Sequence, residues 1–524
     1  MKKLFLIIVL FLLASPAWAT DYYIATTGSD AAAGTIGAPW LTGQKCANTA
    51  VAGDTCNFRT GSYGGFSTPT NGTAGNVITF KNYMSEVVTL DATLGKVSGT
   101  SVIDVVINAS NRSYLTFDGL RITGNTADSG THTNRAHVGF ETTTGSNIIL
   151  KNCQVSFAWG TGVGIYVEAH DITVENCRIF ENAKDNWPRQ TVRDWGAGMI
   201  AFHGCYNITF KDNLIYWNHG EGVTAGDHAH EVTFDGNAVA DNWQTNLYAT
   251  ESSQNITVKN NIVFNTDDAK NWPAPSVGYH ANNPAGIQMT AGDSASSYTF
   301  AQRHITGIKI YNNVVVGAAM GILRYLIEAG HPDSDWLIAN NTLLLVASAG
   351  IKIAGGLSYT DVDIRNNIVT GALSAANSDW AFFNIDIAPV SSTISHNIWN
   401  TSTTNEWIWL GTSYATYSEW AAVSGEVSSS NTSPLLTSES ITLPILRDGD
   451  DTFDRTVFDN ALLLTASSPA VNTGVDLSAT FTVDTLDVTR PQGSAFDRGA
   501  YEKVLTPPPA GGANVNIFVP SGLR

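Results

Sequence analysis

An asparagine returns near the end of a short strand-like phrase throughout the middle of the chain, and this repeat constrains the fold more than any other feature. The phrases VTFDGN, ITVKNN, IKIYNN, LIANN and DIRNN end on Asn237, Asn261, Asn313, Asn341 and Asn367. Related phrases end on Asn213 and Asn397, and Cys153 and Cys177 hold the same place in IILKNC and ITVENC. Most neighbours in this series are 24 to 30 positions apart.

A period in the twenties, with strand-forming residues and no helical stripe between repeats, is typical of a solenoid in which each repeat is one rung. We predict three strands per rung; in the rung of Asn213 they cover 207–211, 214–217 and 222–225. Rungs stack roughly 4.8 Å apart. An asparagine at the same corner of every rung can then hydrogen-bond to the next asparagine and to exposed turn backbone.

The chain begins MKKLFLIIVLFLLASPAWA, with two lysines, an apolar run and a small-residue site at Ala19. This pattern predicts a secretory signal peptide over residues 1–19, too short to be a membrane span. We expect cleavage near Ala19 and a secreted, periplasmic or cell-surface protein that acts as a monomer. No later stretch is apolar enough to cross a bilayer.

The net charge of −18 becomes −20 when Lys2 and Lys3 leave with the signal peptide. Such an acidic protein is a poor candidate for nucleic-acid binding. It would also repel a polyanion unless cations or a local basic cleft intervene.

Five cysteines are few for a secreted chain of this length, so disulfides do not hold the fold together. Cys46 and Cys56 are close enough in sequence to pair. Cys153 and Cys177 could pair or stack as small apolar residues, and Cys205 precedes the next repeat phrase. We favour buried, inert thiols for the three central cysteines.

The segment after the signal, residues 21–66, has an opening strand, a Gly-rich turn, PW, a short helical stretch and GDT-strand-GxY. This order resembles the N-terminal cap of pectate-lyase-like right-handed β-helix proteins. The resemblance implies an all-β, right-handed parallel β-helix with three strands per rung, an N-terminal cap and a C-terminal closing region. The expected divisions are a cap over 20–76, rungs over 77–400, a β-rich closing region over 401–503 and a flexible tail over 504–524.

The third strand of each rung begins with Gly or Asn followed by an apolar residue, as in GIYV, GMIAF, NLYA, GIQM, GILRY and GIKI. At period two, the apolar residue points inward and the next residue outward. The expected outward residues are Tyr166, Thr224, Tyr248, Gln288 and Lys352. In the family that the chain resembles, this sheet lines the substrate groove.

Two long insertions share AK followed by NWP, so Lys184 corresponds to Lys270 and Trp187 to Trp272. Trp217 and Trp243 fall at similar places in other rungs. Exposed aromatic rows suit the apolar faces of sugars. We predict that these tryptophans bind substrate together with Tyr248, Lys184 and Lys352. The alternative is that they fill solenoid corners, with NWP as turn chemistry.

A set of histidines and carboxylates follows the groove strands in successive rungs. His170, His203, Asp227 with His228, and Glu251 should form a column, with Glu221 and His219 at the other edge. Histidine beside carboxylate suits general acid–base work near neutral pH. Asp227, Glu251, Asp267 and Asp268 could instead bind a divalent cation. Any one of these residues could equally be a solvated turn residue.

For a lyase that acts on uronates, the substrate carboxylate must be neutralised and the proton α to it removed. The resemblance implies Ca²⁺ or a basic residue for the first task and Lys or Arg for the second. Lys270 beside Asp267 and Asp268, with Lys184, Arg324 or Lys352, could fill these roles. His203, Glu221 and His228 complete the candidate catalytic set.

Motifs of two related enzyme classes do not match. NTDD at 265–268 resembles the NTD of polygalacturonases and HG at 219–220 resembles their GHG, but the order is reversed and no RxK follows. The DPHD motif of mannuronan epimerases is missing. The sequence therefore favours a polysaccharide lyase that acts on an acidic polymer, with Ca²⁺. A glycan-binding surface protein, and a hydrolase that uses Glu221, Asp227 and Glu251, remain alternatives.

Overall fold

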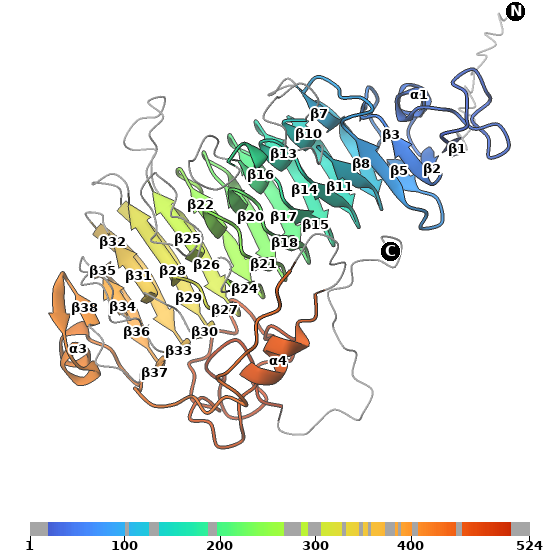
Figure 1. Cartoon of the computed structure of the whole chain (residues 1–524). Coiled ribbons are helices and arrows are strands. Elements are labelled where there is room, and N and C mark those ends of the chain that lie inside the picture. The colour runs from blue at the N-terminus through green and yellow to red at the C-terminus, as the bar shows by residue number, and fades with distance from the viewer. Residues whose placement is uncertain are drawn as a thin grey trace, which may run out of the picture.

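In a computed structural model, three long sheets wind together into one elongated solenoid (Figure 1). The structure describes residues 19–99, 104–124, 136–186, 196–266, 285–291, 305–326, 332–344, 349–354, 358–371, 383–385, 389–400, 407–446 and 453–504. The sheets have 14, 13 and 12 strands, and neighbours within each come from successive rungs. Except for one antiparallel pair at the end of the 13-stranded sheet, the strands pair in parallel. This architecture confirms the predicted right-handed parallel β-helix.

The 14-stranded sheet contains β1 (Asp21–Ile24), β2 (Thr55–Phe58), β5 (Ile78–Asn82), β8 (Ser113–Asp118), β11 (Ser146–Lys151), β14 (His170–Glu175), β17 (Tyr206–Lys211), β20 (His230–Asp235), β23 (Thr257–Lys259), β26 (Thr306–Tyr311), β29 (Pro332–Ala339), β32 (Ser358–Arg365), β35 (Pro389–Val390) and β36 (Thr393–Ser395).

The 13-stranded sheet contains β4 (Phe66–Ser67), β7 (Val105–Asn108), β10 (Val138–Thr143), β13 (Thr161–Tyr166), β16 (Ala197–Phe202), β19 (Glu221–Ala225), β22 (Thr245–Thr250), β25 (Ala285–Ala291), β28 (Met320–Leu326), β31 (Ala349–Ala354), β34 (Phe383–Ile385), β38 (Trp407–Trp409) and β39 (Thr412–Tyr414).

The 12-stranded sheet contains β3 (Gly61–Tyr63), β6 (Val88–Asp91), β9 (Arg121–Thr123), β12 (Gln154–Ser156), β15 (Arg178–Phe180), β18 (Leu214–Tyr216), β21 (Ala238–Ala240), β24 (Ile262–Phe264), β27 (Val314–Val316), β30 (Thr342–Leu344), β33 (Ile368–Thr370) and β37 (Ile398–Asn400). The strands β17, β18 and β19 match the three predicted for the rung of Asn213 to within one residue at each end.

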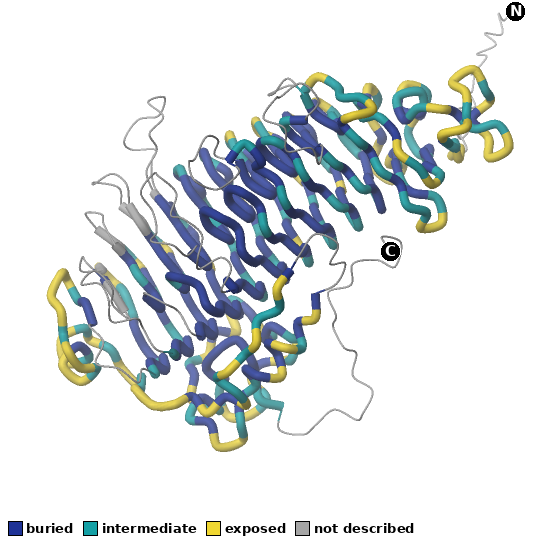
Figure 2. Tube along the Cα trace, in the orientation of Figure 1, coloured by how far each residue is buried: buried dark blue, intermediate teal, exposed yellow. Residues whose placement is uncertain are grey.

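The inward residues of each strand stack on their equivalents above and below. In the 14-stranded sheet, one such column contains Ile148, Ile172, Ile208 and Val232, all almost fully buried. β-Branched residues suit these positions because they pack well on a pleated surface. A continuous apolar core therefore runs along the solenoid, as the dark tube in Figure 2 shows.

The asparagine repeat forms a ladder at the corner between the 14- and 12-stranded sheets. Asn237 is typical: its Nδ2 donates to Phe210 O at 2.9 Å and to Asn261 Oδ1 at 3.0 Å. Its Oδ1 accepts from the backbone N–H and the Nδ2 of Asn213, both at 3.0 Å. The residue before each ladder position has positive φ, such as Asp212 at 52°, so the chain turns sharply there. The ladder satisfies backbone groups that this turn would otherwise leave unpaired.

The two cysteines take the predicted places at the start of this ladder. Cys153 N–H donates to Cys177 Sγ at 3.4 Å, and Cys177 N–H donates to Asn213 Oδ1 at 2.9 Å. Together with Cys205 they are free, fully buried thiols, as predicted. Burial raises the pKa of Cys205 to about 12, which keeps its thiol protonated.

A second asparagine ladder, which the sequence analysis missed, lies at the corner between the 12- and 13-stranded sheets. Asn182 donates to Asn218 at 3.0 Å, Asn218 to Asn242 at 2.8 Å and Asn242 to Asn246 at 3.0 Å. Asn246 donates to Asn265 at 2.8 Å. The signal was an asparagine five positions after the first ladder residue in three rungs.

The outer face of the 14-stranded sheet carries a column of charges that alternate in sign. The register places in one line Lys81, Asp118, Lys151, Glu175, Lys211, Asp235 and Lys259. Lys259 contacts Asp235 at 3.2 Å. Side chains directly opposite on paired strands repel when their charges match. Alternation gives each charge neighbours of opposite sign along the stack.

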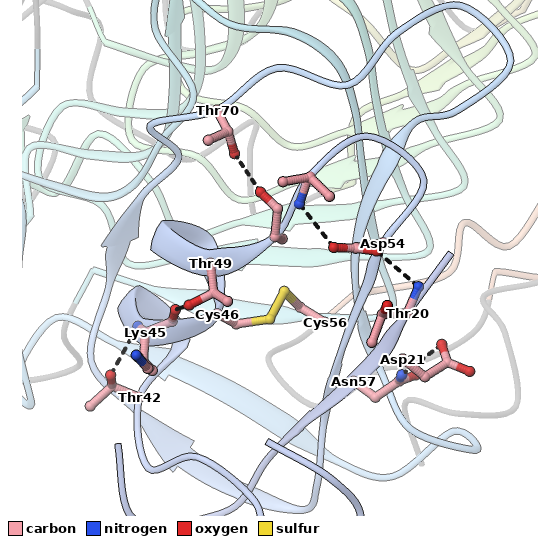
Figure 3. The surroundings of a disulfide bond; sticks show 12 residues. Thr20, Asp21, Thr42, Lys45, Cys46, Thr49, Asp54, Cys56, Asn57 and Thr70 are labelled. Atoms are coloured by element: carbon pink, nitrogen blue, oxygen red, sulfur yellow. Dashed lines mark hydrogen bonds between the residues drawn. A yellow bond between two sulfur atoms is a disulfide. The ribbon is translucent and has the colours of Figure 1, made fainter. Parts of the chain in front are cut away.

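The N-terminal cap closes the first rung with a helix and a disulfide (Figure 3). Helix α1 (Gly43–Thr49) begins after Thr42, whose side chain accepts from Lys45 N–H at 3.1 Å. Cys46 on this helix is bonded to Cys56 on β2, which confirms that pairing. Asp54 accepts from the backbone of Thr20, so the start of the described chain is fastened to the cap. The cap covers the edge that the first rung would expose.

The C-terminal residues pack against the outer face of the 12-stranded sheet instead of extending the solenoid (Figures 1 and 2). Helix α3 (Tyr417–Ser424) caps the last rungs through Trp420, and α4 (Thr456–Leu462) presents Phe458 to Phe264. The described part of residues 401–503 holds only β38 and β39 besides these helices and extended chain, so it is less β-rich than expected.

The motif DRGAYE at 497–502 fastens this region to the rungs. Arg498 donates to Asn397 O at 3.3 Å, and Ala500 N–H donates to Thr342 Oγ1 at 2.9 Å. Arg490 and Glu502 form an ion pair at 3.2 Å that is almost fully buried. The 12-stranded sheet is therefore covered along much of its outer face, which makes it the poorest of the three sheets as a candidate for function.

Within the described ranges, no helix is long and apolar enough to span a membrane. The signal-peptide prediction falls almost entirely on residues 1–18, and the tail prediction on residues 505–524. Both lie outside the described residues.

Candidate functional site

The register of the 13-stranded sheet fixes which side chains share its outer face. Thr224 pairs with Tyr248, and Tyr248 pairs with Gln288, so the predicted alignment of these three outward residues is confirmed. Lys352 follows two rungs later, beside Leu323. Tyr166 is two residues out of line, because it pairs with Phe202 while Gly164 occupies the Thr224 column. The two glycines in TGVGIY made the shifted alignment look equivalent.

A network of polar side chains lies in register on this face across β19, β22 and β25. The Thr224 hydroxyl donates to the Glu221 carboxyl, and Gln288 Nε2 donates to Thr290 Oγ1 at 3.0 Å. The Tyr248 hydroxyl is hydrogen-bonded with the side chains of Thr250 and Thr290. These groups are largely buried, so they are held in place rather than solvated.

Burial raises the pKa of Glu221 to about 8, with a further contribution from the Glu251 carboxylate, while the Thr224 hydrogen bond opposes the shift. Burial, with the charges of Glu221 and Glu251, also raises the pKa of Tyr248. At neutral pH Glu221 is therefore a protonated carboxylic acid beside a neutral phenol. A carboxyl whose pKa lies near the working pH can donate a proton or a neutral hydrogen bond.

The corner after these strands holds the predicted column, with one correction. His203 directly follows β16, and its Nδ1 is bonded to Oδ2 of Asp227, which holds the same place one rung later. Glu251 follows in the next rung, since His228 N–H donates to Glu251 O at 2.9 Å. His170 is not in this column: it pairs with Tyr206, three residues beyond His203. His228 is half-buried beside the column.

Asp227 raises the pKa of His203, chiefly through the hydrogen bond and also through its charge. Partial burial of His203 lowers this pKa, and the charge of Glu251 raises it further. The side chain of His203 is 54% exposed, whereas that of Asp227 is 12% exposed. Because Nδ1 is engaged, the imidazole can present Nε2 to a ligand. This arrangement resembles a carboxylate-oriented general base.

A buried cluster of three charged or titratable groups lies at the opposite edge of the sheet. Glu181 Oε2 accepts from His219 Nε2 at 2.6 Å and from Lys184 Nζ at 2.8 Å. Asn186 Nδ2 donates to His219 O at 3.0 Å. Burial raises the pKa of Glu181, but the hydrogen bond and charges of His219 and Lys184 outweigh it and lower the pKa to about 2. Lys184, predicted to bind substrate, is thus engaged in a buried ion pair that anchors the segment leading to Glu221.

The remaining predicted residues fall in three places. Arg324 is 1% exposed and shares an inward column with Met289 and Ile353. Trp243 is buried, and Trp217 is half-buried against the cluster that joins the 12-stranded sheet to the C-terminal region. Outside the described residues lie Trp187, Trp272, Lys270, Asp267 and Asp268.

The predicted Ca²⁺ site falls partly outside the described residues and stays a prediction. Ca²⁺ takes six to eight oxygen ligands. Of the four predicted carboxylates, Asp227 and Glu251 are described, and Asp227 is committed to His203. Among the described residues, no group of three or more His, Cys, Asp or Glu side chains is arranged to hold a metal.

Family comparisons agree with this geometry. Residues 22–254 match the family model described as "Pel9A-like, right handed beta helix region", and residues 189–323 match "Right handed beta helix region". With three parallel sheets and a capped N-terminus, the chain is a right-handed parallel β-helix protein. Over residues 22–254 it is similar to the pectate-lyase-like proteins of that fold.

Individual relatives are distant. A Bacillus subtilis (strain 168) protein named "Uncharacterized protein YwoF" is 25% identical over 433 residues, which cover 76% of this chain and 85% of that one. The structure of pectate lyase Pel9A is 17% identical, with a TM-score of 0.48, and the match covers 92% of this chain and 96% of that chain. PfbA, a surface adhesin of Streptococcus pneumoniae, is 12% identical with a TM-score of 0.44, covering 71% and 87%.

Proposed function

We propose that this protein is a carbohydrate-active enzyme of the extracytoplasmic space that cleaves an acidic, uronate-containing polysaccharide by β-elimination. The observation that carries the proposal is the buried polar network of Glu221, Thr224, Tyr248 and Gln288 on the outer face of the 13-stranded sheet. The match to a Pel9A-like family supports the same class, since the Pel9A structure is that of a pectate lyase.

The network offers a way to hold a uronate without a cation. The Tyr248 phenol and the Gln288 amide are neutral hydrogen-bond donors at neutral pH. Donors of this kind can bind a substrate carboxylate and lower the cost of removing the proton α to it. They do so without adding charge to an acidic protein.

β-Elimination also needs a base and a proton donor for the leaving oxygen. Lys270 remains the proposed base, and His203, oriented by Asp227, is the alternative within the described residues. Glu221, with its pKa near 8, can protonate the leaving oxygen. The proposed Ca²⁺ would assist with the substrate carboxylate if Asp267 and Asp268 join Asp227 and Glu251.

The test is a screen of polygalacturonate, alginate and glycosaminoglycans, with and without a chelator, followed by absorbance of the unsaturated product in the near ultraviolet. We expect one acidic polymer to be cleaved, with roughly 100-fold loss in Glu221→Gln and normal rates in the exposed control Asp361→Asn. A full rate in Glu221→Gln would remove this network from the mechanism. An unchanged rate with chelator would remove Ca²⁺.

A hydrolase is the second candidate, and one observation favours it. Glycosidases use a protonated carboxylic acid and a carboxylate on either side of the bond. Glu221 is protonated, and Glu251 lies near enough for its charge to raise the Glu221 pKa. New reducing ends without ultraviolet absorbance would identify this reaction. Glycan binding with neither product would identify a binding protein.

A further inference from the structure

A row of stacked rings lies on the outer face of the 14-stranded sheet, around the corner from the proposed active site. His170, Tyr206 and His230 open β14, β17 and β20 and pair in register. Their ring centroids are 4.6 and 5.2 Å apart, and the rings are within 13° of parallel. Because each ring packs on the next, their faces are covered and their polar edges point away from the stack.

In each histidine of this row, one ring nitrogen is hydrogen-bonded and the other is available to a ligand. His170 Nδ1 bonds to Asp171 Oδ2 at 2.8 Å, and His230 Nδ1 bonds to His228 O at 3.3 Å. Both imidazoles therefore keep Nε2 for another partner. In the part of the chain that the structure describes, neither these Nε2 atoms nor the Tyr206 hydroxyl has a hydrogen-bond partner. Three polar tips thus lie in a line, one per rung.

A hollow of about 380 Å³ opens beside the row and is lined by these rings with Thr144, Glu168 and Gly204. Gly204 has a φ of 74°, and a Cβ placed there would meet only Glu168 Cγ within 4 Å, at 3.8 Å. The rungs on either side carry Glu168 and His228 at the equivalent position. The missing side chain therefore keeps the hollow open, and its size falls within the range of small-ligand sites.

We propose that this row is a second binding site, for a neutral, hydroxyl-rich saccharide, separate from the groove on the 13-stranded sheet. Neutral imidazole Nε2 accepts from a hydroxyl, and the tyrosine hydroxyl both donates and accepts. A sugar chain lying along the solenoid axis presents hydroxyls at each of the three tips. The rigid ring stack lowers the entropy lost on binding.

The surrounding charges select against an anionic ligand. Three exposed carboxylates border the row: Glu168, Asp171 and Glu231. Hydrogen bonding to His170 lowers the pKa of Asp171, so that group stays ionised. A uronate would meet these negative charges, whereas a neutral sugar would not. The site therefore differs in ligand class from the proposed substrate of the groove.

The experiment is a glycan array of neutral cello-, xylo- and manno-oligosaccharides beside galacturonate and alginate oligosaccharides, followed by calorimetry on each glycan bound. We expect a neutral glycan to bind, Tyr206→Ala to weaken it by roughly 10-fold or more, and Tyr206→Phe by roughly fivefold, the worth of one hydrogen bond. Tyr206→Phe keeps the stack, so its effect cannot come from unfolding. Tyr83→Ala, which removes a half-buried tyrosine just after β5, should bind normally.

Three outcomes would overturn the proposal: no neutral glycan binds, only anionic glycans bind, or Tyr206→Ala and Tyr206→Phe both bind like wild type. The groove is tested separately. Glu221→Gln should slow cleavage of an acidic polymer roughly 100-fold and leave binding of the neutral glycan unchanged, so failure of one proposal does not imply failure of the other.

Discussion

The 14-stranded sheet is bounded by two corners whose backbones turn alike and whose side chains follow opposite patterns. At the corner with the 12-stranded sheet, asparagine recurs from Asn213 to Asn397, and each one is fully buried. At the corner with the 13-stranded sheet, successive rungs carry Val167, His203, Asp227 and Glu251, all with φ between 48° and 62°. At the first corner the positive-φ residue comes just before each asparagine, as Asp212 does, and the asparagine beside it repeats; at the second corner the positive-φ residues are themselves four different residues.

This contrast separates structural need from function. A repeated residue satisfies a demand that every rung makes, which here is pairing of backbone groups at a buried turn. Residues that vary from rung to rung at a positive-φ place, with no asparagine ladder beside them, are not explained by the repeat. His203, Asp227 and Glu251 belong to this second kind, and they flank the buried network of Glu221.

The largest expected effect comes from breaking the uniform corner. Asn237→Ala removes a side chain that bonds to Phe210 O, to Asn261 and to the backbone of Asn213. Buried groups left without partners cost about 1–3 kcal/mol each, so we expect a loss of roughly 4 kcal/mol in unfolding free energy. Urea denaturation measures it. Asn48→Ala, on an exposed face of α1, should change stability by less than about 0.5 kcal/mol; equal losses would show that the ladder is not special.

Glu221→Gln tests the varied side of the comparison. Burial raises the pKa of Glu221 to about 8, so between pH 4.5 and 8 the folded protein holds a proton that the unfolded chain releases. Stability from this group is therefore present at low pH and lost as pH rises through 8. Relative to pH 4, the variant should therefore gain several kcal/mol of stability over wild type by pH 8. Thermal unfolding from pH 4 to 9 measures this, and identical pH profiles would contradict the buried, protonated state.

Asp227→Asn should affect His203 more than the fold. The pKa of His203 is raised by its hydrogen bond to Asp227, so its contribution to stability is full below pH 6.5 and is lost as pH rises through the folded-state pKa. Without the carboxylate the pKa should fall toward its ordinary value. Since His203 is half exposed, the stability change should stay below about 1 kcal/mol. NMR titration of the His203 ring gives the pKa, and Asp361→Asn is the control. An unchanged His203 pKa in Asp227→Asn would show that Asp227 does not influence His203.

Much of the fold could be predicted from the chain because rungs repeat. The positions of Asn213 and Asn237 set the period, and the alternation in phrases such as ITFKDN set the strands. The alignment failed at GIYV, where two glycines two residues apart gave equally good registers and no repeated side chain chose between them. The C-terminal region was harder, since its contacts with the 12-stranded sheet join residues more than 100 positions apart, such as Arg498 and Asn397.

The candidate site was predicted only in part, for a related reason. Residue type and rung position brought His203, Asp227 and Glu251 together. The orientation of Lys184 depended on Glu181 and His219, which come from two different rungs, and exposure of tryptophans such as Trp243 depended on what covers them. The spacing of repeats in the sequence shows which residues of successive rungs are aligned. It says little about which corners of the solenoid are buried by other segments of the chain.

The smallest expected effect concerns the alternating charge column on the 14-stranded sheet. There the alternation of charge sign is repeated from rung to rung, while the residue type changes. Lys211 lies between Glu175 and Asp235 in register. Lys211→Glu would place three carboxylates in line, and like charges directly opposite are destabilising. We expect a loss of about 1 kcal/mol, which should shrink in high salt because these side chains are partly exposed.

Lys211→Gln removes the charge without reversing it and should lose less, about 0.3 kcal/mol, since exposed ion pairs contribute little. Thermal unfolding of both variants at low and high ionic strength measures the difference. If Lys211→Glu and Lys211→Gln were equally stable at low salt, alternation of sign would have no energetic role. The charge column would then not stabilise the fold as the asparagine ladder does. It would be a set of surface residues that varies from rung to rung, as at the His203 corner.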